Sequence, residues 1–237
     1  MDVWLVGGAW ITADGWGRLG EGKRVTLAPG APALPELRTI LDRPVSRYGR
    51  FDTFTRLGLS TVALALKDAG WLDTPPSEPV GMVVSSVLEV LQTDFVYYRT
   101  TLEQSGLLSS PNLFSYTLPV AVLGECASNF HLTGPTFVLG DDGSNGRNAL
   151  AEALSLMATG EADKMIAGWI DSPPKAADLL NEPEPLSGAV FVALDAIPQA
   201  DRPPSRRLIC DRNEVILEEG RQFASLVDLL NSMLLSR

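Results

Sequence analysis

The stretch Thr136-Phe-Val-Leu-Gly-Asp-Asp-Gly-Ser-Asn-Gly-Arg-Asn-Ala-Leu150 decides how this chain is expected to fold. It begins with an apolar run, Thr136 to Leu139, that predicts a strand. A turn dense in Gly, Asp, Ser and Asn follows, and the residues from Asn148 to Ala158 then predict a helix. A strand that passes through a tight turn into a helix has the geometry of a nucleophile elbow, which aims backbone N–H groups at one exposed side chain.

The remaining chain alternates between apolar runs and helical patterns. Apolar runs predict further strands at 3–6, 80–86, 164–168 and 188–195. Apolar residues at helical spacing predict helices over 52–70, 92–105 and 120–130. Segments rich in Pro, Gly or charged residues predict surface loops at 18–50 and 172–185. Strands that alternate with helices predict an α/β layered fold with a mostly parallel sheet flanked by helices.

A division of the chain is expected near residue 197. Residues 1–197 would form the layered domain, and residues 198–237 a tail that begins with a polar segment. Residues 207–211 are expected to be extended, and the stretch 214–235 predicts an amphipathic helix. The apolar positions along one side of this helix are Phe223, Leu226, Val227, Leu230, Met233 and Leu234.

The charge balance excludes several classes of partner. Among 237 residues, 29 acidic side chains stand against 19 basic ones, which gives a formal net charge of −10. Nucleic acids and anionic membrane surfaces are bound through clustered Lys and Arg, so neither partner is expected. The N-terminus lacks a basic signal-peptide region and no apolar run is long enough to span a membrane, which predicts a cytoplasmic protein.

No metal or cofactor site is expected. The two cysteines, Cys126 and Cys210, lie far apart without metal-ligand spacing, and His131 is the single histidine. Gly7-Gly8 follows the first apolar run, but no GxGxxG pattern accompanies it, which argues against a bound dinucleotide. Cys126 is expected to be a buried hydrophobic residue and His131 to stand at a helix end.

Five motifs occur along the chain in a distinctive order and spacing. They are Val6-Gly-Gly-Ala-Trp-Ile-Thr-Ala-Asp-Gly-Trp-Gly17, Tyr48-Gly-Arg-Phe-Asp52 with the helix that ends at Gly70, Ser110-Pro-Asn-Leu-Phe-Ser-Tyr-Thr-Leu-Pro119, Leu132-Thr-Gly-Pro135 and Gly160-Glu-Ala-Asp-Lys-Met-Ile-Ala-Gly168. Together they resemble the N-terminal half of a β-ketoacyl synthase, which has the thiolase-like fold. The resemblance covers roughly residues 1–197.

The resemblance also implies what the elbow has lost. In that family the elbow contains Ala-Cys-Ser-Ser-Gly or a variant of it, and its cysteine accepts the acyl group. Matching the elbow glycine and the following Ala149-Leu150 places Gly143 at the cysteine position, followed by Ser144-Asn145-Gly146. A thiolate makes acyl transfer possible at neutral pH, and glycine offers no such group. The family's two further polar residues, His-His or His-Asn, belong to a C-terminal half that this chain does not reach.

The resemblance therefore implies a catalytically inactive subunit similar to a chain length factor. Such a subunit pairs with an active, full-length β-ketoacyl synthase in fatty acid, polyketide or aryl polyene biosynthesis and meets the acyl carrier protein only indirectly. It implies that the strand Thr136-Phe137-Val138-Leu139-Gly140 pairs with its counterpart across a two-fold axis. It implies that Phe95, Tyr97 or Tyr98 limits the length of the acyl tunnel, although ordinary core or interface packing is the alternative for these aromatic residues. A half-fold also leaves an apolar layer, which either the tail helix or another subunit must cover.

Two other functions stay open. Ser144 would be the nucleophile of a standalone acyltransferase or hydrolase, but no base is placed beside it, and helix capping by Ser144 or Asn145 is the alternative. A homodimeric module that binds acyl groups or carrier protein is the second. Asp141 and Asp142 are interpreted as turn residues near the start of a helix rather than as an acid/base pair or as metal ligands.

Overall fold

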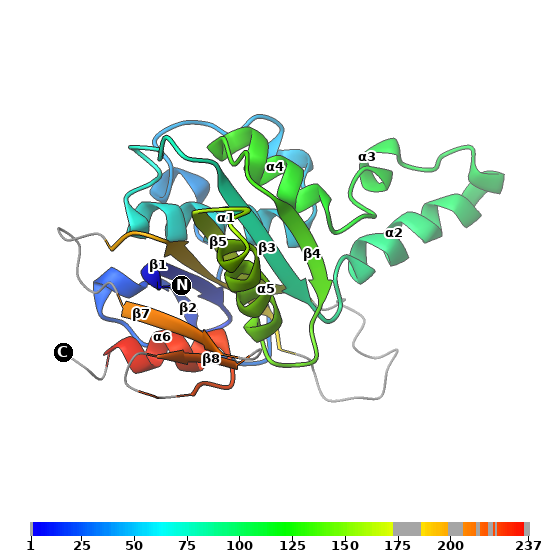
Figure 1. The fold of residues 1–237 in the computed structure, drawn as a ribbon. Coiled ribbons are helices and arrows are strands. Elements are labelled where there is room, and N and C mark those ends of the chain that lie inside the picture. Colours follow the sequence, from blue (N-terminus) through cyan, green and yellow to red (C-terminus); the bar gives the residue numbers. More distant parts are fainter. Residues whose placement is uncertain are drawn as a thin grey trace.

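The computed structural model describes residues 2–172, 186–198, 206–211, 214–217, 220 and 222–234 (Figure 1). The loop expected at 172–185 falls outside these residues apart from its first position, and the side chain of Cys210 is outside them as well. Within the described ranges, no helix is both long and apolar enough to cross a lipid bilayer.

A single sheet runs through the molecule in the order β4-β3-β5-β6-β1-β7-β8, and β2 pairs with the far part of β1. The strands are β1 (Val3–Thr12), β2 (Gly15–Arg18), β3 (Val80–Ser86), β4 (Thr136–Gly140), β5 (Lys164–Asp171), β6 (Gly188–Asp195), β7 (Arg206–Asp211) and β8 (Glu214–Leu217). The helices are α1 (Thr53–Ala69), α2 (Leu91–Leu102), α3 (Pro111–Phe114), α4 (Ala121–Phe130), α5 (Arg147–Ala158) and α6 (Leu226–Leu234). Short 3₁₀ turns occupy η1 (Leu19–Glu21), η2 (Leu37–Thr39), η3 (Tyr48–Arg50) and η4 (Glu103–Gly106).

The layered α/β fold is confirmed, but the expected strand direction is wrong for most of the sheet. Among the described strands, β3 pairs in parallel with β4 and β5, and the other five pairings are antiparallel. The parallel direction was predicted from the alternation of strands with helices along the chain. Strands β1, β5 and β6 are buried along almost their whole length although they pair antiparallel to one another, because helices cover both faces of a mixed sheet.

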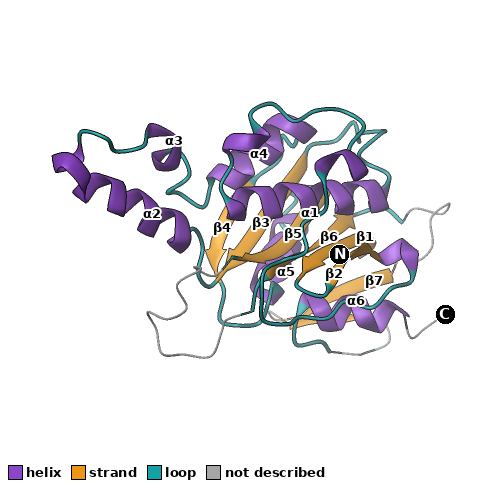
Figure 2. Cartoon of the chain, turned by 180° about the vertical axis from the view of Figure 1, so that it is seen from behind, coloured by secondary structure: helices purple, strands orange, loops and turns teal. Residues whose placement is uncertain are grey.

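Two helical layers enclose the sheet. Helices α1 and α4 pack against one face, and their core includes Phe54, Leu57 and Val122 (Figure 2). Helices α5 and α6 pack against the other face, and their core includes Leu150 and Trp169 (Figure 1). The neighbouring residues Val83 and Val84 of β3 belong to opposite cores, as the alternation of side chains along a strand requires.

Helix α1 shows how local sequence sets these layers. The carboxylate of Asp52 accepts a hydrogen bond from the backbone N–H of Thr55 at 2.9 Å and so caps the first turn. Gly70 adopts a left-handed conformation at the C-terminal end, where its N–H bonds to the last carbonyls. Thirteen of the 17 residues of α1 are buried, which matches the helix predicted over 52–70.

The tail differs from its prediction. The helix expected over 214–235 is confirmed only as α6, because Glu214–Leu217 forms strand β8 and pairs with β7. The apolar run Val215-Ile216-Leu217 is compatible with a helix or with a strand. It forms a strand because it pairs with β7. Helix α6 covers the second face of the sheet, so the tail helix supplies the cover that a half-fold requires.

A helical arm projects from this body. It consists of α2, η4 and α3 and leaves the sheet at the end of β3, beside the edge strand β4 (Figures 1 and 2). The arm returns to the body where α4 begins. Helix α2 thus begins near the end of the edge strand β4 and extends away from the sheet (Figure 1).

Candidate functional site

The elbow lies where β4 ends at the edge of the sheet. Gly140 is level with Ser86 on the neighbouring parallel strand, and the N–H of Asp141 donates to the Ser86 carbonyl at 2.9 Å. Residues 141–146 then turn the chain into α5. The strand, turn and helix predicted for this stretch are therefore all present.

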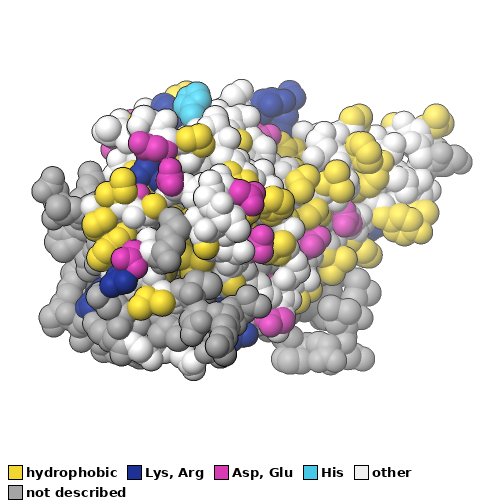
Figure 3. Space-filling model, viewed as in Figure 1, with side chains coloured by type: hydrophobic (Ala, Val, Ile, Leu, Met, Phe, Trp, Pro, Cys, Tyr) yellow, Lys and Arg dark blue, Asp and Glu magenta, His cyan; other side chains and the backbone are white. Residues whose placement is uncertain are grey.

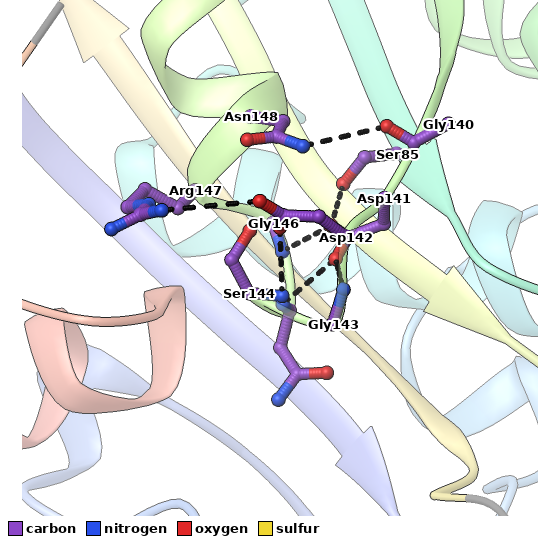
Figure 4. A network of polar contacts seen from close by, with 10 residues as sticks. Ser85, Gly140, Asp141, Asp142, Gly143, Ser144, Gly146, Arg147 and Asn148 are labelled. Carbon is purple, nitrogen blue, oxygen red and sulfur yellow. Dashed lines mark hydrogen bonds and ion pairs between the residues drawn. The ribbon is translucent and has the colours of Figure 1, made fainter.

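The carboxylate of Asp141 organises the turn (Figure 4). One oxygen accepts the backbone N–H groups of Gly143 at 2.8 Å and Asn145 at 3.1 Å. The other accepts the N–H of Gly146 at 2.9 Å and the hydroxyl of Ser85 at 2.6 Å. A carboxylate surrounded by converging N–H groups at the start of a helix is a stable arrangement.

Asp142 has a different environment although it is the next residue. Its side chain is exposed, and it accepts the N–H of Ser144 at 3.1 Å and lies 4.0 Å from Arg147. The hydroxyl and the N–H of Ser144 lower the pKa of Asp142 below its ordinary value. The expected capping of α5 by Ser144 or Asn145 is wrong: Gly146 is the N-cap residue, without a side-chain cap, and Asp141 bonds the loop N–H groups instead.

Gly143 leaves the elbow open at the position that the sequence assigned to a nucleophile. Its φ of +88° lies in the left-handed region, and no described residue other than its two chain neighbours lies within 4 Å of the place where a Cβ would stand. Gly146, by contrast, is confined, because a Cβ there would overlap the side chain of Leu226 and approach Trp169. Only glycine fits both the φ of +95° and this close approach.

The other candidate nucleophiles and bases lie away from reactive positions. The hydroxyl oxygen of Ser144 is buried. His131 precedes β4 as the left-handed C-cap of α4, so the length of β4 separates it from Ser144. Cys126 is fully buried within α4, and burial raises the pKa of its thiol.

A second carboxylate, Asp171, anchors the base of the arm. It accepts the hydroxyl of Ser86 at 2.7 Å, the N–H of Leu88 at 2.8 Å and the indole N–H of Trp169 at 2.6 Å. Burial raises the pKa of Asp171 above its ordinary value, against the lowering effect of these donors. Asp171 was not among the predicted site residues; its only signal in the sequence is an acidic residue at the end of an apolar strand.

The aromatic residues of α2 fall into two groups. Tyr97 packs within the arm, with its ring 5.5 Å from that of Phe114. Phe95 and Tyr98 lie on the exposed side, 37% and 59% accessible to solvent. Leu91 and Leu102, which the sequence analysis did not select, complete the same face at a spacing of four, three and four residues.

The edge strand β4, near the base of the arm, is a second exposed feature (Figure 1). In the described part of the chain β4 pairs on one side alone, with β3. Phe137 at its centre is 43% exposed. Apolar side chains gather over the arm (Figure 3). The segment from the end of α2 to the start of α4 also has exposed apolar side chains at Leu107, Leu108, Phe114, Leu118 and Val120.

An open cleft of ≈ 730 Å³ lies between η3, α3 and α4. Arg47 and Arg50 line one side of it, and the carboxylate of Glu125 lies on another. Glu125 accepts the hydroxyl of Tyr116 at 3.1 Å, and burial together with Glu125 raises the pKa of Tyr116 to about 12. The cleft contains none of the site residues that the sequence predicted.

Comparison with known proteins places the chain in a family. The family described as "Beta-ketoacyl synthase, N-terminal domain" matches residues 39–179. A putative polyketide β-ketoacyl synthase 1 from Streptomyces virginiae is 28% identical over 193 residues, which are 76% of this chain and 43% of that protein. A second protein of that description, from Streptomyces halstedii, is 26% identical over 87% of this chain and 51% of its own length. The chain thus spans about half the length of the curated relatives it matches.

Solved structures agree on the fold. The ishigamide ketosynthase/chain length factor superimposes with a TM-score of 0.68 at 18% identity, over 88% of this chain and 66% of that chain. A ketosynthase in complex with its chain length factor from Xenorhabdus doucetiae superimposes with a TM-score of 0.58 at 15% identity, over 89% of both chains. With 141 of its 237 residues matched (39–179), and with the thiolase-like fold of these neighbours, the chain belongs to the β-ketoacyl synthase family, whose N-terminal domain it contains.

Proposed function

We propose that this chain is a ketosynthase-like subunit without catalytic activity of its own. It pairs in the cytoplasm with a full-length β-ketoacyl synthase and limits the length of the acyl chain that the partner builds. Its pathway would be fatty acid, polyketide or aryl polyene biosynthesis, and the acyl carrier protein would interact mainly with the partner.

The apolar surface formed by the arm and the edge of β4 carries this proposal. Leu91, Phe95, Tyr98 and Leu102 present one apolar stripe on α2, and β4 has an unpaired edge in the described part of the chain. Exposed apolar surface of this kind marks protein interfaces, and an open strand edge invites pairing with another chain. Among the described residues, most of the large exposed apolar side chains lie between Val87 and Phe137 in the sequence, the segment that contains the arm and β4.

The elbow supports an inactive role. At the position of the acyl-accepting residue Gly143 has no side chain, and apart from its chain neighbours Asp142 and Ser144 no described residue reaches within 4 Å of that place. Ser144, the alternative nucleophile, has a buried hydroxyl and no imidazole beside it. A standalone acyltransferase or hydrolase therefore has little support from this geometry.

The length of the matched chains supports the choice of partner. One solved neighbour is a ketosynthase bound to its chain length factor. Our chain covers 89% of the length of the chain that it matches in that complex. A second neighbour is a ketosynthase/chain length factor as well. We transfer the pairing in these complexes to this chain as a proposal.

Affinity purification from the native cells, followed by mass spectrometry of the bound proteins, tests this function. The proposal predicts a full-length β-ketoacyl synthase in equimolar amount. Recovery of the chain only with itself would favour the homodimeric acyl- or carrier-protein-binding module. Acyl transfer by the isolated chain, abolished by Ser144→Ala, would favour the standalone acyltransferase or hydrolase.

A further inference from the structure

The backbone N–H groups of the elbow converge on a single point. Those of Gly143, Asn145 and Gly146 all lie within 3.1 Å of one carboxylate, that of Asp141, and the hydroxyl of Ser85 joins them from β3. Left-handed φ angles at Gly143, Asn145 and Gly146 produce this convergence. Backbone groups arranged in this way form a concave site for negative charge, and in an acyl-transferring elbow they would have to be free for an oxyanion.

The loop is also held from outside. The N–H of Leu226, at the start of α6, donates to the carbonyl of Asn145 at 3.3 Å. The Leu226 side chain packs on Gly146 so closely that no Cβ fits between them. Helix α6 is itself fixed, because the Asn231 side chain bonds both the N–H and the carbonyl of Val25, at 3.0 and 2.9 Å.

We propose that Asp141 is a positioning residue that locks the elbow shut: its carboxylate uses the donors that an oxyanion would need, and α6 prevents the loop from reopening. A tethered carboxylate always competes at high effective concentration, so a free anion does not displace it. The elbow is thus a rigid structural loop and does not bind a ligand. The chain has lost its electrophilic donors as well as its nucleophile, and restoring the nucleophile alone restores no acyl acceptor.

This inference deepens the proposed function but is tested on the isolated chain, so the two can fail separately. The space around Gly143 admits a side chain, although the left-handed backbone strains any residue but glycine by about 1–2 kcal/mol. The probe is therefore the variant Gly143→Cys, in which the pKa of the new thiol is measured from its rate of alkylation by iodoacetamide against pH. A two-dimensional amide spectrum of each variant checks that the fold is retained.

In Gly143→Cys the thiol is expected to titrate above the ordinary value of about 8.5, because Asp141 adds negative charge and occupies the N–H groups. Adding Asp141→Ala frees these donors and should lower the thiol pKa by about one unit or more. Adding Asp142→Ala instead removes an exposed carboxylate from the same turn and should produce a clearly smaller shift. If Asp141→Ala does not fold, Asp141→Asn replaces it, with a shift in the same direction.

Equal thiol pKa values with and without the Asp141 carboxylate would overturn the proposal. So would an equal effect of Asp142→Ala, since a general charge effect would then explain both. A purely stabilising role of Asp141 would change the unfolding free energy without changing the thiol pKa, and the experiment separates the two.

Discussion

Asp141 and Asp142 are adjacent in the sequence and differ in almost every physical respect. Asp141 accepts four hydrogen bonds, from three backbone N–H groups and from Ser85, whereas Asp142 is exposed to solvent. We expect Asp141→Asn to lower the free energy of unfolding by about 2–3 kcal/mol, because the donors lose a charged acceptor. Asp142→Asn should change it by no more than about 0.5 kcal/mol.

Urea unfolding followed by circular dichroism measures both values. Equal losses in the two variants would show that the loop does not depend on the Asp141 carboxylate.

Asp171 leads to a pH prediction. Burial raises its pKa in the folded chain, so the folded state holds the proton more tightly than the unfolded state. Its contribution to stability is therefore full below the unfolded pKa of about 3.9 and is lost as the pH rises through the higher folded pKa. The stability of the wild type relative to Asp171→Asn should accordingly fall as the pH increases across that window. Unfolding curves collected from pH 3.5 upward check this, and a relative gain in stability with rising pH would contradict it.

Sequence alone could not separate these carboxylates. Two neighbouring aspartates in a turn have the same local pattern, and only the position of Ser85 on β3 and the φ angles of the loop distinguish them. Gly143 could be predicted because its position follows from the strand and the helix on either side. The role of Asp171 depends on β3 and β5 lying side by side, which is a tertiary property.

At the scale of elements, substitutions on the two sides of α2 are expected to have different effects, on product length and on stability. In the reconstituted complex, Phe95→Ala and Tyr98→Ala remove bulk from the exposed stripe and should lengthen the products. Tyr97→Ala breaks the contact with Phe114 and should instead lower the stability of the arm by about 0.5–1.5 kcal/mol beyond the buried area lost. Mass spectrometry of the released acyl products decides between these roles. If Phe95→Ala and Tyr98→Ala both leave the product length unchanged, neither side chain limits the length of the acyl tunnel.

The edge of β4 offers a test of pairing. A lysine at its centre discourages edge-to-edge association, so Phe137→Lys should abolish binding of the ketosynthase. Ile197→Lys is the matched control, because Ile197 is 68% exposed but follows β6, three positions from β4 in the sheet. Size-exclusion chromatography of each variant mixed with the partner reports the result. Equal losses in both variants would point to a general loss of fold instead of a broken interface.

Helix α1 could be predicted from its periodicity and its caps, and α5 from its periodicity, because those signals are local. The direction of the strands could not, since β6 and β1 are buried on both faces in the same way as parallel strands. The helix predicted over 214–235 was too long for a related reason. The sequence Val215-Ile216-Leu217 is compatible with a helix or a strand, and its pairing with β7 is not a local property. The exposed stripe of α2 needed the position of Phe114 to separate Tyr97 from its neighbours.

For the whole molecule, the tail helix closes the second face of the sheet. Leu226, Leu229, Leu230 and Met233 are all buried there. We expect Leu226→Ala to cost about 2–5 kcal/mol of stability, as other large-to-small core changes do. Val227→Ala, at a partly buried position on the same helix, should cost less. Thermal and urea unfolding measure both, and a cost for Val227→Ala equal to that of Leu226→Ala would argue against α6 as the cover of this face.

Native mass spectrometry of this chain co-expressed with its full-length β-ketoacyl synthase tests the central claim most directly. The account predicts one dominant species that contains one copy of each chain, lost in Phe137→Lys and retained in Ile197→Lys. A wild-type chain that stays monomeric or forms only homodimers in the presence of that ketosynthase would contradict it.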